Sequence, residues 1–209
     1  MYLPTAFKEN NPDALAAFIE AHPFGLFITG EEGGPSATPM PFLFRKKEGA
    51  PYLFGHMAKA NPHWRACEEA KTCLVVFQGE HNYVTPSWYA SKRETHRVVP
   101  TWNYETLHVK GRPRAVCDAD WLREHVRELT DAMERLRPSP WKLSDAPEDF
   151  VAPLLKAIVG IEICVTDMCG KRKLSQNRSP ADVSGVVAGL SDPNDPHRNP
   201  ALADVMRTL

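Results

Sequence analysis

The chain has 209 residues, a formal net charge of −1 and 43% hydrophobic residues. This length fits one domain whose core needs no disulfide or metal to hold it together. A charge so close to zero argues against a protein whose main role is to coat nucleic acid or an acidic membrane. Because no apolar run approaches the ~20 residues of a spanning helix and the N-terminus lacks a signal-peptide pattern, we expect a cytoplasmic protein.

Short strands separated by turn signals dominate the first half of the chain. Asn11-Pro12 and Asn61-Pro62 each predict the start of a helix, with Asn as the cap and Pro in the first turn. Pro39 and Pro41 each remove a backbone donor, so their strand must bend or lie at a sheet edge. The predicted strands are residues 25–29, 36–45, 52–54 and 73–77, then a hairpin of 98–109 and 112–116 that turns about Gly111.

The second half changes to a helical period. Apolar residues repeat every three or four positions over 122–136, which predicts a helix capped by Asp120 and stopped by Pro138. We also expect helices at 148–158 and from Ser179, a late strand at 160–167 and a loosely ordered tail at 192–200. The fold class is therefore mainly β (α+β), with a barrel core in residues 1–117. Residues 118–209 form a helical region whose late strand completes the same domain.

An aromatic-rich segment runs from Tyr83 to Gly111. It contains Tyr83, Trp88, Tyr89, Trp102 and Tyr104 among short polar residues and two prolines. Amphipathic aromatics of this kind suit a surface that grips a flat polar ligand. They equally suit a contact with a partner subunit, because interfaces also favour Trp and Tyr. Both interpretations stay open from composition.

The segment 55–62, GHMAKANP, joins a strand to a helix start. It offers Lys59 as a cation, Asn61 and His56 as donors, and free amide groups, which together favour an anion site. The alternative is a capping loop with a surface lysine. Next to an aromatic-rich strand pair, the segment predicts a pocket for a phosphate and a ring.

Other chemical motifs are weak. The histidines and cysteines lack zinc spacing, and no G-x-S-x-G, Walker or GxGxxG sequence occurs. We therefore assign no catalytic residue and no metal ligand. The basic run 171–173 with Arg178 could contact phosphate, but such runs are more often solvated turns.

Several segments together resemble one known family. The chain is similar to the PaiB-type FMN-binding negative transcriptional regulators, which share a split β-barrel with the pyridoxine-phosphate oxidase flavoproteins. The matching segments cover most of the chain in order: MYLPTAF (1–7), HPFGLFIT (22–29), ATPMPFLF (37–44), GHMAKANPHW (55–64), YVTPSWYASK (83–92), VPTWNYETLHVKG (99–111) and GIEICVTDMCGKRKLSQNRS (160–179).

The resemblance implies a homodimer with FMN bound in clefts between the subunits. It implies that the loop from His56 to Asn61 holds the phosphate, with Lys59 as the pairing charge. It also implies that Lys173 to Arg178 reaches the partner subunit. The cofactor-binding residues that follow from it are Thr38, Pro39, Met40 and Pro41 along the flavin, His56, Met57, Lys59 and Asn61 at the phosphate, and Trp88, Trp102 and Asn103 at the ring or the dimer contact.

The family name implies repression of transcription, through DNA bound directly or through a partner. The sequence has no convincing helix-turn-helix, and the helix at 121–137 mixes arginines with acidic residues, which favours an indirect route. An FMN-dependent oxidoreductase that uses a small electron donor is the alternative. A haem-binding or haem-degrading split-barrel protein, with His56, His96 or His108 as ligand, is a lesser one. A dimeric scaffold without a ligand is the fourth.

Overall fold

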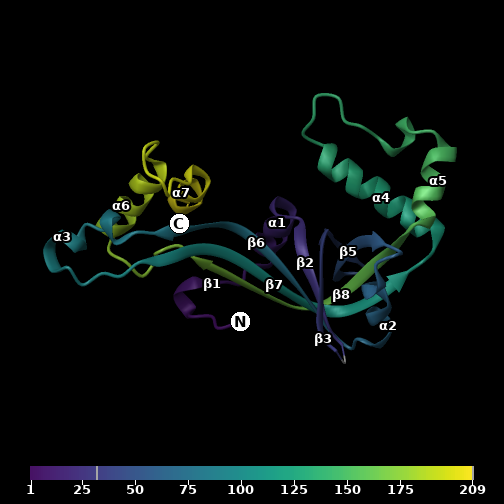
Figure 1. The fold of residues 1–209 in the computed structure, drawn as a ribbon, viewed down its shortest axis with the longest axis horizontal. Coiled ribbons are helices and arrows are strands. Elements are labelled where there is room, and N and C mark those ends of the chain that lie inside the picture. Colours follow the sequence, from purple (N-terminus) through teal and green to yellow (C-terminus); the bar gives the residue numbers. More distant parts are fainter. Residues whose placement is uncertain (32, 209) are drawn as a thin grey trace. The chain divides into compact units, whose positions relative to one another are not determined.

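The computed structural model describes residues 1–31 and 33–208, and these form an eight-stranded sheet with helices attached (Figure 1). The strand order is β3-β2-β6-β7-β8-β5-β4, and β1 pairs with β8. The strands are β1 (Lys8–Glu9), β2 (Phe24–Glu31), β3 (Gly34–Pro41), β4 (Leu43–Lys47), β5 (Ala50–Ala58), β6 (Cys73–Val84), β7 (Thr101–Val116) and β8 (Ile158–Lys173). This arrangement confirms the expected mainly β (α+β) class.

The helices lie between and after the strands. None of those that the structure describes is long and apolar enough to cross a membrane. The α-helices are α1 (Pro12–Ala21), α2 (Ala66–Glu69), α3 (Ser91–Thr95), α4 (Ala119–Glu134), α5 (Glu148–Lys156), α6 (Pro180–Ser191) and α7 (Pro200–Arg207). Short 3₁₀ helices are η1 (Thr5–Phe7), η2 (Pro62–Arg65), η3 (Pro86–Trp88) and η4 (Leu143–Asp145).

The chain divides into two compact units built from interleaved segments. Unit 1 comprises residues 1–15, 78–107 and 169–209, and unit 2 comprises residues 16–77 and 108–168. The long strands β6, β7 and β8 therefore contribute residues to both units. The domain division expected from the sequence, with a boundary at residue 117, stays a prediction.

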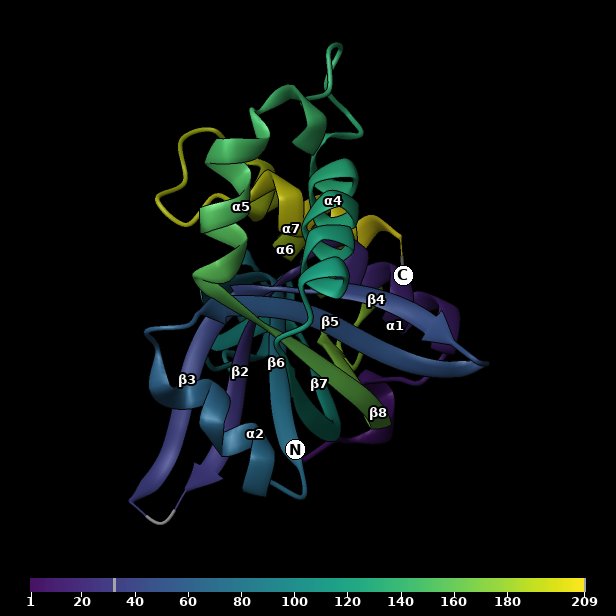
Figure 2. The same cartoon turned by 90° about the vertical axis from the view of Figure 1, so that its right-hand side faces the viewer.

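Unit 2 carries the barrel strands around an apolar core. β2 pairs antiparallel with β3 and β6, and β5 pairs antiparallel with β4 and β8. Phe27, Phe42 and Phe77 are fully buried, and the Phe42 and Phe77 rings meet edge to face at 5.8 Å. Figure 2 shows α2 beside β2 and β3, and α4 beside α5.

Unit 1 has its own core beneath the C-terminal helices. α6 and α7 pack on each other (Figure 1), and Leu174, Leu190 and Leu202 are fully buried there. The helix expected from Ser179 is α6, and Ser179 caps it, because its side chain accepts a hydrogen bond from the amide of Asp182. The Asp182 carboxylate in turn accepts from the backbone amide and the hydroxyl of Ser91.

The expected hairpin about Gly111 is wrong. β7 runs without a turn for 16 residues through that position. Gly111 instead allows β7 to lie close to Ile163 and Cys164, because a Cβ there would lie 2.5 Å from both the Cys164 carbonyl oxygen and Ile163 Cγ2. A glycine that permits backbone crowding and a glycine that permits a turn look alike in sequence.

Three other boundaries also differ from the sequence-based expectation. The strand expected at 36–45 divides into β3 and β4, since Phe42 between them pairs its amide with the carbonyl of Pro23. Helix α4 is capped by Asp118 rather than Asp120, with the carboxylate accepting from the Trp121 amide at 2.8 Å. The tail at 192–200 leads into α7, which the sequence did not predict and which Asn199 caps.

Candidate functional site

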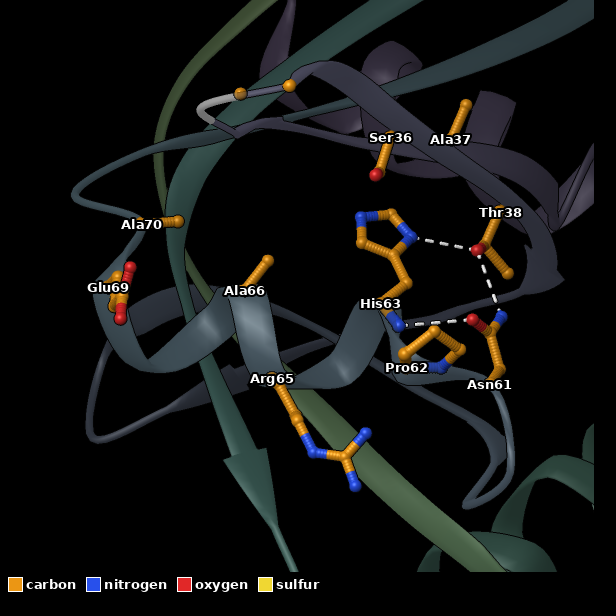
Figure 3. Close-up of a pocket in the computed structure, with 12 residues that line it drawn as sticks. Ser36, Ala37, Thr38, Asn61, Pro62, His63, Arg65, Ala66, Glu69 and Ala70 are labelled. Atoms are coloured by element: carbon orange, nitrogen blue, oxygen red, sulfur yellow. Dashed lines mark hydrogen bonds between the residues drawn. The ribbon is translucent and has the colours of Figure 1, made fainter.

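The candidate site is a pocket of about 1010 Å³ in unit 2. This volume lies at the upper end of the roughly 300–1,000 Å³ that small-molecule sites span. β2, β3, η2 and α2 bring its walls together, as Figure 3 shows. The lining residues are Gly30, Gly33, Ser36, Ala37, Thr38, Asn61, Pro62, His63, Arg65, Ala66, Glu69 and Ala70.

Asn61 is held in place by the turn that it caps. Its side-chain oxygen accepts a hydrogen bond from the His63 amide at 3.1 Å, with Pro62 at the first helical position. The same side chain donates through Nδ2 to Thr38 Oγ1 at 3.2 Å. The local cap therefore also orients an amide across the pocket toward β3.

His63 is the centre of the polar contacts in this pocket. Its side chain points from η2 toward β2 and β3 (Figure 3), and the residue is 6% exposed. Nδ1 lies 2.8 Å from Thr38 Oγ1, and Nε2 lies 2.8 Å from Thr29 Oγ1. The ring also packs on Phe27, with 4.8 Å between the ring centroids. Sequence reasoning missed His63, although it follows the predicted Asn61-Pro62 cap directly.

Charged groups lie at the rim of the pocket. Arg65 and Glu69 are exposed lining residues, and the Arg65 guanidinium stacks over the Trp64 ring at 4.8 Å. η2 and α2 have four residues each, so few peptide dipoles align there. An anion in this pocket would therefore depend on side chains more than on the helix start that the sequence suggested.

Among the residues predicted to bind the cofactor, the structure brings Thr38 and Asn61 together in this pocket. Lys59 lines a separate pocket of about 280 Å³ together with Arg123 and Lys156. Its backbone amide donates to the carbonyl of Ala157 at 2.8 Å, which ties this loop to the end of α5. The predicted role of Lys59 in binding phosphate stays a prediction.

The other predicted residues of β3 and β5 lie mostly on faces away from this pocket. Met40 and Met57 are buried in the core. Pro39 is exposed and stands opposite Leu26, and Pro41 stands opposite Phe24 in the β2–β3 ladder. β3 is an edge strand of the sheet, as expected for a strand that contains Pro39, because proline lacks the backbone donor that a central strand needs.

His56 belongs to a second polar cluster in unit 2. Its Nδ1 lies 3.0 Å from Nε2 of His125 on α4, and the Trp121 ring stacks on His125 at 5.2 Å. Burial lowers the pKa of His56. The pKa of His125 is lowered to about 3, mainly by burial and to a smaller extent by repulsion from His56. Both imidazoles are therefore neutral at pH 7.

The three predicted residues of the aromatic-rich segment lie in unit 1. Trp88 donates through Nε1 to the Asp195 carboxylate at 2.9 Å. Asn103 is fully buried and exchanges hydrogen bonds with the Ser175 hydroxyl. Trp102 is 53% exposed, and its ring stacks near that of His81. Trp88 and Asn103 thus have structural partners, whereas Trp102 presents its ring to the surface.

Comparison with known proteins places the chain in a family. The model of the family described as "Putative FMN-binding domain" matches residues 1–167. The chain belongs to this family. FMN is accordingly its cofactor, and the predicted resemblance is confirmed.

Two curated relatives match nearly end to end. The "Protease synthase and sporulation protein PAI 2" of Bacillus subtilis is 36% identical over 206 residues, covering 99% of this chain and 96% of that protein. An uncharacterized protein of Emericella nidulans is 33% identical over 228 residues, covering 92% and 91%.

Solved structures show the same fold at low identity. The FAD and heme binding protein from Mycobacterium smegmatis has a TM-score of 0.60 at 16% identity, covering 85% of this chain and 78% of that one. The flavocytochrome Anf3 from Azotobacter vinelandii has a TM-score of 0.56 at 18% identity, covering 79% of this chain and 69% of that one. The split β-barrel of the FMN-binding flavoproteins is thus the fold of this chain.

The residues of the pocket fit the phosphate end of FMN. The Thr38 hydroxyl and the Asn61 amide supply neutral donors, and the exposed Arg65 supplies a positive charge at the rim. The volume accommodates a ligand larger than a phosphate alone. When bound, FMN supplies the redox chemistry of its ring, while the protein supplies binding and orientation.

Proposed function

We propose that this protein binds FMN with the phosphate in the pocket of Thr38, Asn61 and His63, and acts as a homodimeric negative regulator of transcription. The observation that supports the phosphate position is the hydrogen-bonded group of Thr38, Asn61 and His63 in one cavity of about 1010 Å³, which Arg65 also lines. Phosphate groups are held in proteins by such hydroxyl and amide donors together with a guanidinium.

Titration of the purified protein with FMN and with riboflavin tests the phosphate position. Riboflavin has the same ring without the phosphate, so the ratio of the two dissociation constants measures the phosphate contribution. We expect FMN to bind at least tenfold more tightly than riboflavin, the scale for one hydrogen bond to a charged group. Equal affinities would show that the phosphate makes no productive contact.

The homodimer is supported by an apolar outer face of the β2–β3 edge. Phe24 is 66% exposed and Leu26 is 37% exposed, and both belong to β2, the strand next to the edge strand β3. Exposed apolar side chains clustered on a strand pair are typical of surfaces that a second subunit covers. Sedimentation of Phe24→Ser with Leu26→Ser should show monomers, whereas the wild type should sediment as a dimer.

The regulatory role is supported by the name of the Bacillus subtilis relative, which refers to protease synthesis and sporulation. We propose that the effect on transcription follows FMN occupancy and reaches DNA directly or through a partner. Selection from a random DNA library with FMN-loaded protein tests direct contact. Enrichment of one motif with salt-sensitive binding supports it, and no enrichment assigns the contact to a partner.

An FMN-dependent oxidoreductase is the second candidate function. The volume of the pocket favours it, because a cavity at the upper end of the usual range leaves room for a small electron donor beside the flavin. Stopped-flow reduction of the bound flavin by NADH and NADPH tests this candidate. Turnover with either donor supports the enzyme, and flavin that stays oxidised with both argues for the regulator.

A further inference from the structure

The His63 imidazole is placed so that it can carry a proton. A neutral imidazole has one donor and one acceptor nitrogen, whereas an imidazolium has two donors. Both His63 nitrogens lie 2.8 Å from a hydroxyl oxygen, that of Thr38 on β3 and that of Thr29 on β2. Hydroxyl oxygens accept as readily as they donate. The protonated ring is therefore fully paired even though it is buried.

The state of His63 decides what Thr38 can offer to a ligand. Thr38 Oγ1 already accepts from Asn61 Nδ2 at 3.2 Å. When Nδ1 of His63 carries hydrogen, Oγ1 accepts from it as well, and both of its acceptor positions are filled. Among the described residues no other contact of Oγ1 is found, so its single hydrogen is left to point into the pocket. That hydrogen suits a phosphate oxygen.

Among the described residues that line the pocket, the two charged ones, Arg65 and Glu69, come from η2 and α2. β2 and β3 present the hydroxyls of Thr29, Thr38 and Ser36, while η2 and α2 present Arg65 and Glu69. Arg65 favours a bound dianion and Glu69 opposes it, but both are exposed, so solvent screens them. A charge on the buried His63 ring would act at closer range and with less screening.

We infer that His63 is a positioning residue that couples the binding of the flavin phosphate to the uptake of one proton. A neutral ring can carry its hydrogen on either nitrogen, whereas the imidazolium always carries one on Nδ1, so it keeps the Thr38 hydrogen free for the phosphate and adds a positive charge behind it. By linkage, bound phosphate favours the protonated ring, and proton uptake tightens phosphate binding. This inference rests on the proposed position of the phosphate.

Calorimetric titration with FMN in two buffers of different ionisation enthalpy tests the inference in the wild type. Between pH 6.5 and 8.5 the FMN phosphate is largely a dianion, because its second pKa is near 6. We expect net uptake of up to about one proton per FMN, and an FMN affinity that rises as pH falls, by at most about tenfold per pH unit. Riboflavin should bind with no proton uptake.

Two substitutions assign the proton to His63. His63→Asn can replace the Nδ1 contact with Thr38, and His63→Gln can replace the Nε2 contact with Thr29, but neither titrates. We expect both to bind FMN with a flat pH profile. His96→Asn is the matched control, because His96 is exposed and lies in the left-handed region (φ 56°), which asparagine tolerates. It should keep the wild-type profile.

The outcomes separate this inference from the proposed function. If the wild type binds FMN more tightly than riboflavin but takes up no proton, the inference is overturned and the phosphate position stands. If both His63 variants keep the wild-type proton uptake, the inference is likewise overturned. If FMN and riboflavin bind equally, the phosphate makes no productive contact, and the proposed position and the inference fall together.

Discussion

Two buried histidines of unit 2 differ in the hydrogen-bond partners that surround the imidazole. His63 is 6% exposed and His125 is 4% exposed, so burial alone does not distinguish them. Each nitrogen of His63 faces a threonine hydroxyl. In contrast, His125 shares Nε2 with another imidazole, and among the described residues its buried Nδ1 has no hydrogen-bond partner.

The difference lies in what the surroundings can do with a proton. Around His125 the partner is a second ring of the same kind, and Trp121 covers the face of the imidazole, so a charge there would be poorly solvated. Around His63 two hydroxyl oxygens can accept from a charged ring. The partners of a buried histidine therefore decide whether it is a packing residue or a proton-binding one.

The largest expected effect is the pH dependence that His125 adds to stability. Its pKa is about 3 in the fold, against 6.5 for the ordinary group. The unfolded chain therefore binds more protons below pH 6.5, so the stabilising contribution is complete above that pH and is lost as pH falls toward 3. Between pH 6.5 and 4.5 we expect a loss of about 2.5 kcal/mol from this residue.

Urea unfolding of the wild type and of His125→Phe at several pH values measures this contribution. Phenylalanine keeps the contact with Trp121 but does not titrate, and carboxylates elsewhere affect both proteins alike. The stability difference between the two proteins should therefore change by about 2.5 kcal/mol in favour of the variant as pH falls to 4.5. A difference that is constant with pH would contradict a neutral, desolvated His125.

The next effect concerns the hydroxyl that faces His63. Thr38→Val keeps the shape of the side chain but removes the donor, so we expect FMN binding to weaken by about 2 kcal/mol, roughly 30-fold. Riboflavin affinity should stay unchanged. Fluorescence titration measures both. Ser36→Ala is the matched control, because Ser36 lines the same pocket from the same strand; an equal loss there would remove the special role of Thr38.

A smaller effect is expected where Trp121 packs against the sheet. A Cβ at Gly160 would overlap the Trp121 ring, so Gly160→Ala should move the ring away from β8 and destabilise the fold by about 1.5 kcal/mol. Gly30→Ala is the control, since a Cβ there meets nothing within 4 Å. Thermal unfolding of the two variants compares them, and equal midpoints would show that Trp121 adapts without cost.

The smallest effect is expected at Lys59. Its side chain lines a different pocket from that of Thr38 and Asn61, and it is exposed. Lys59→Ala should therefore weaken FMN binding by about 0.5 kcal/mol, the scale of a screened surface charge. Titration in low and high salt measures it. A loss as large as that of Thr38→Val would place the phosphate beside Lys59, as the sequence suggested.

Local chemistry explains which parts of the structure the sequence could predict. Asn11, Asn61 and Ser179 each cap a helix start within two or three residues, and each was predicted because the partners are neighbours in the chain. The apolar run 73–77 was predicted as a buried strand for the same reason, since alternate burial follows from strand geometry. Family membership followed from such short segments in order.

The errors arose where distant segments meet. Gly111 was taken for a turn because its neighbours on β8, Ile163 and Cys164, lie about fifty residues away and leave no local trace. Helix α7 was missed because its stability comes from packing Leu202 and Met206 into the unit 1 core. The polar segment before α7 gives no sign of this packing. Propensity is a weak guide wherever tertiary contacts supply most of the stability.

The sequence by itself therefore determined several helix starts, most of the strands, the family and the cofactor, because these depend on local patterns and on their order. The tertiary structure alone decided the chemistry of His63. Its two hydroxyl partners come from positions 25 and 34 residues away on β3 and β2, and the register of those strands places them at the imidazole. A histidine acquires its function from such partners, because the donors and acceptors around the imidazole, and not its position in the chain, decide whether the ring can hold a second proton.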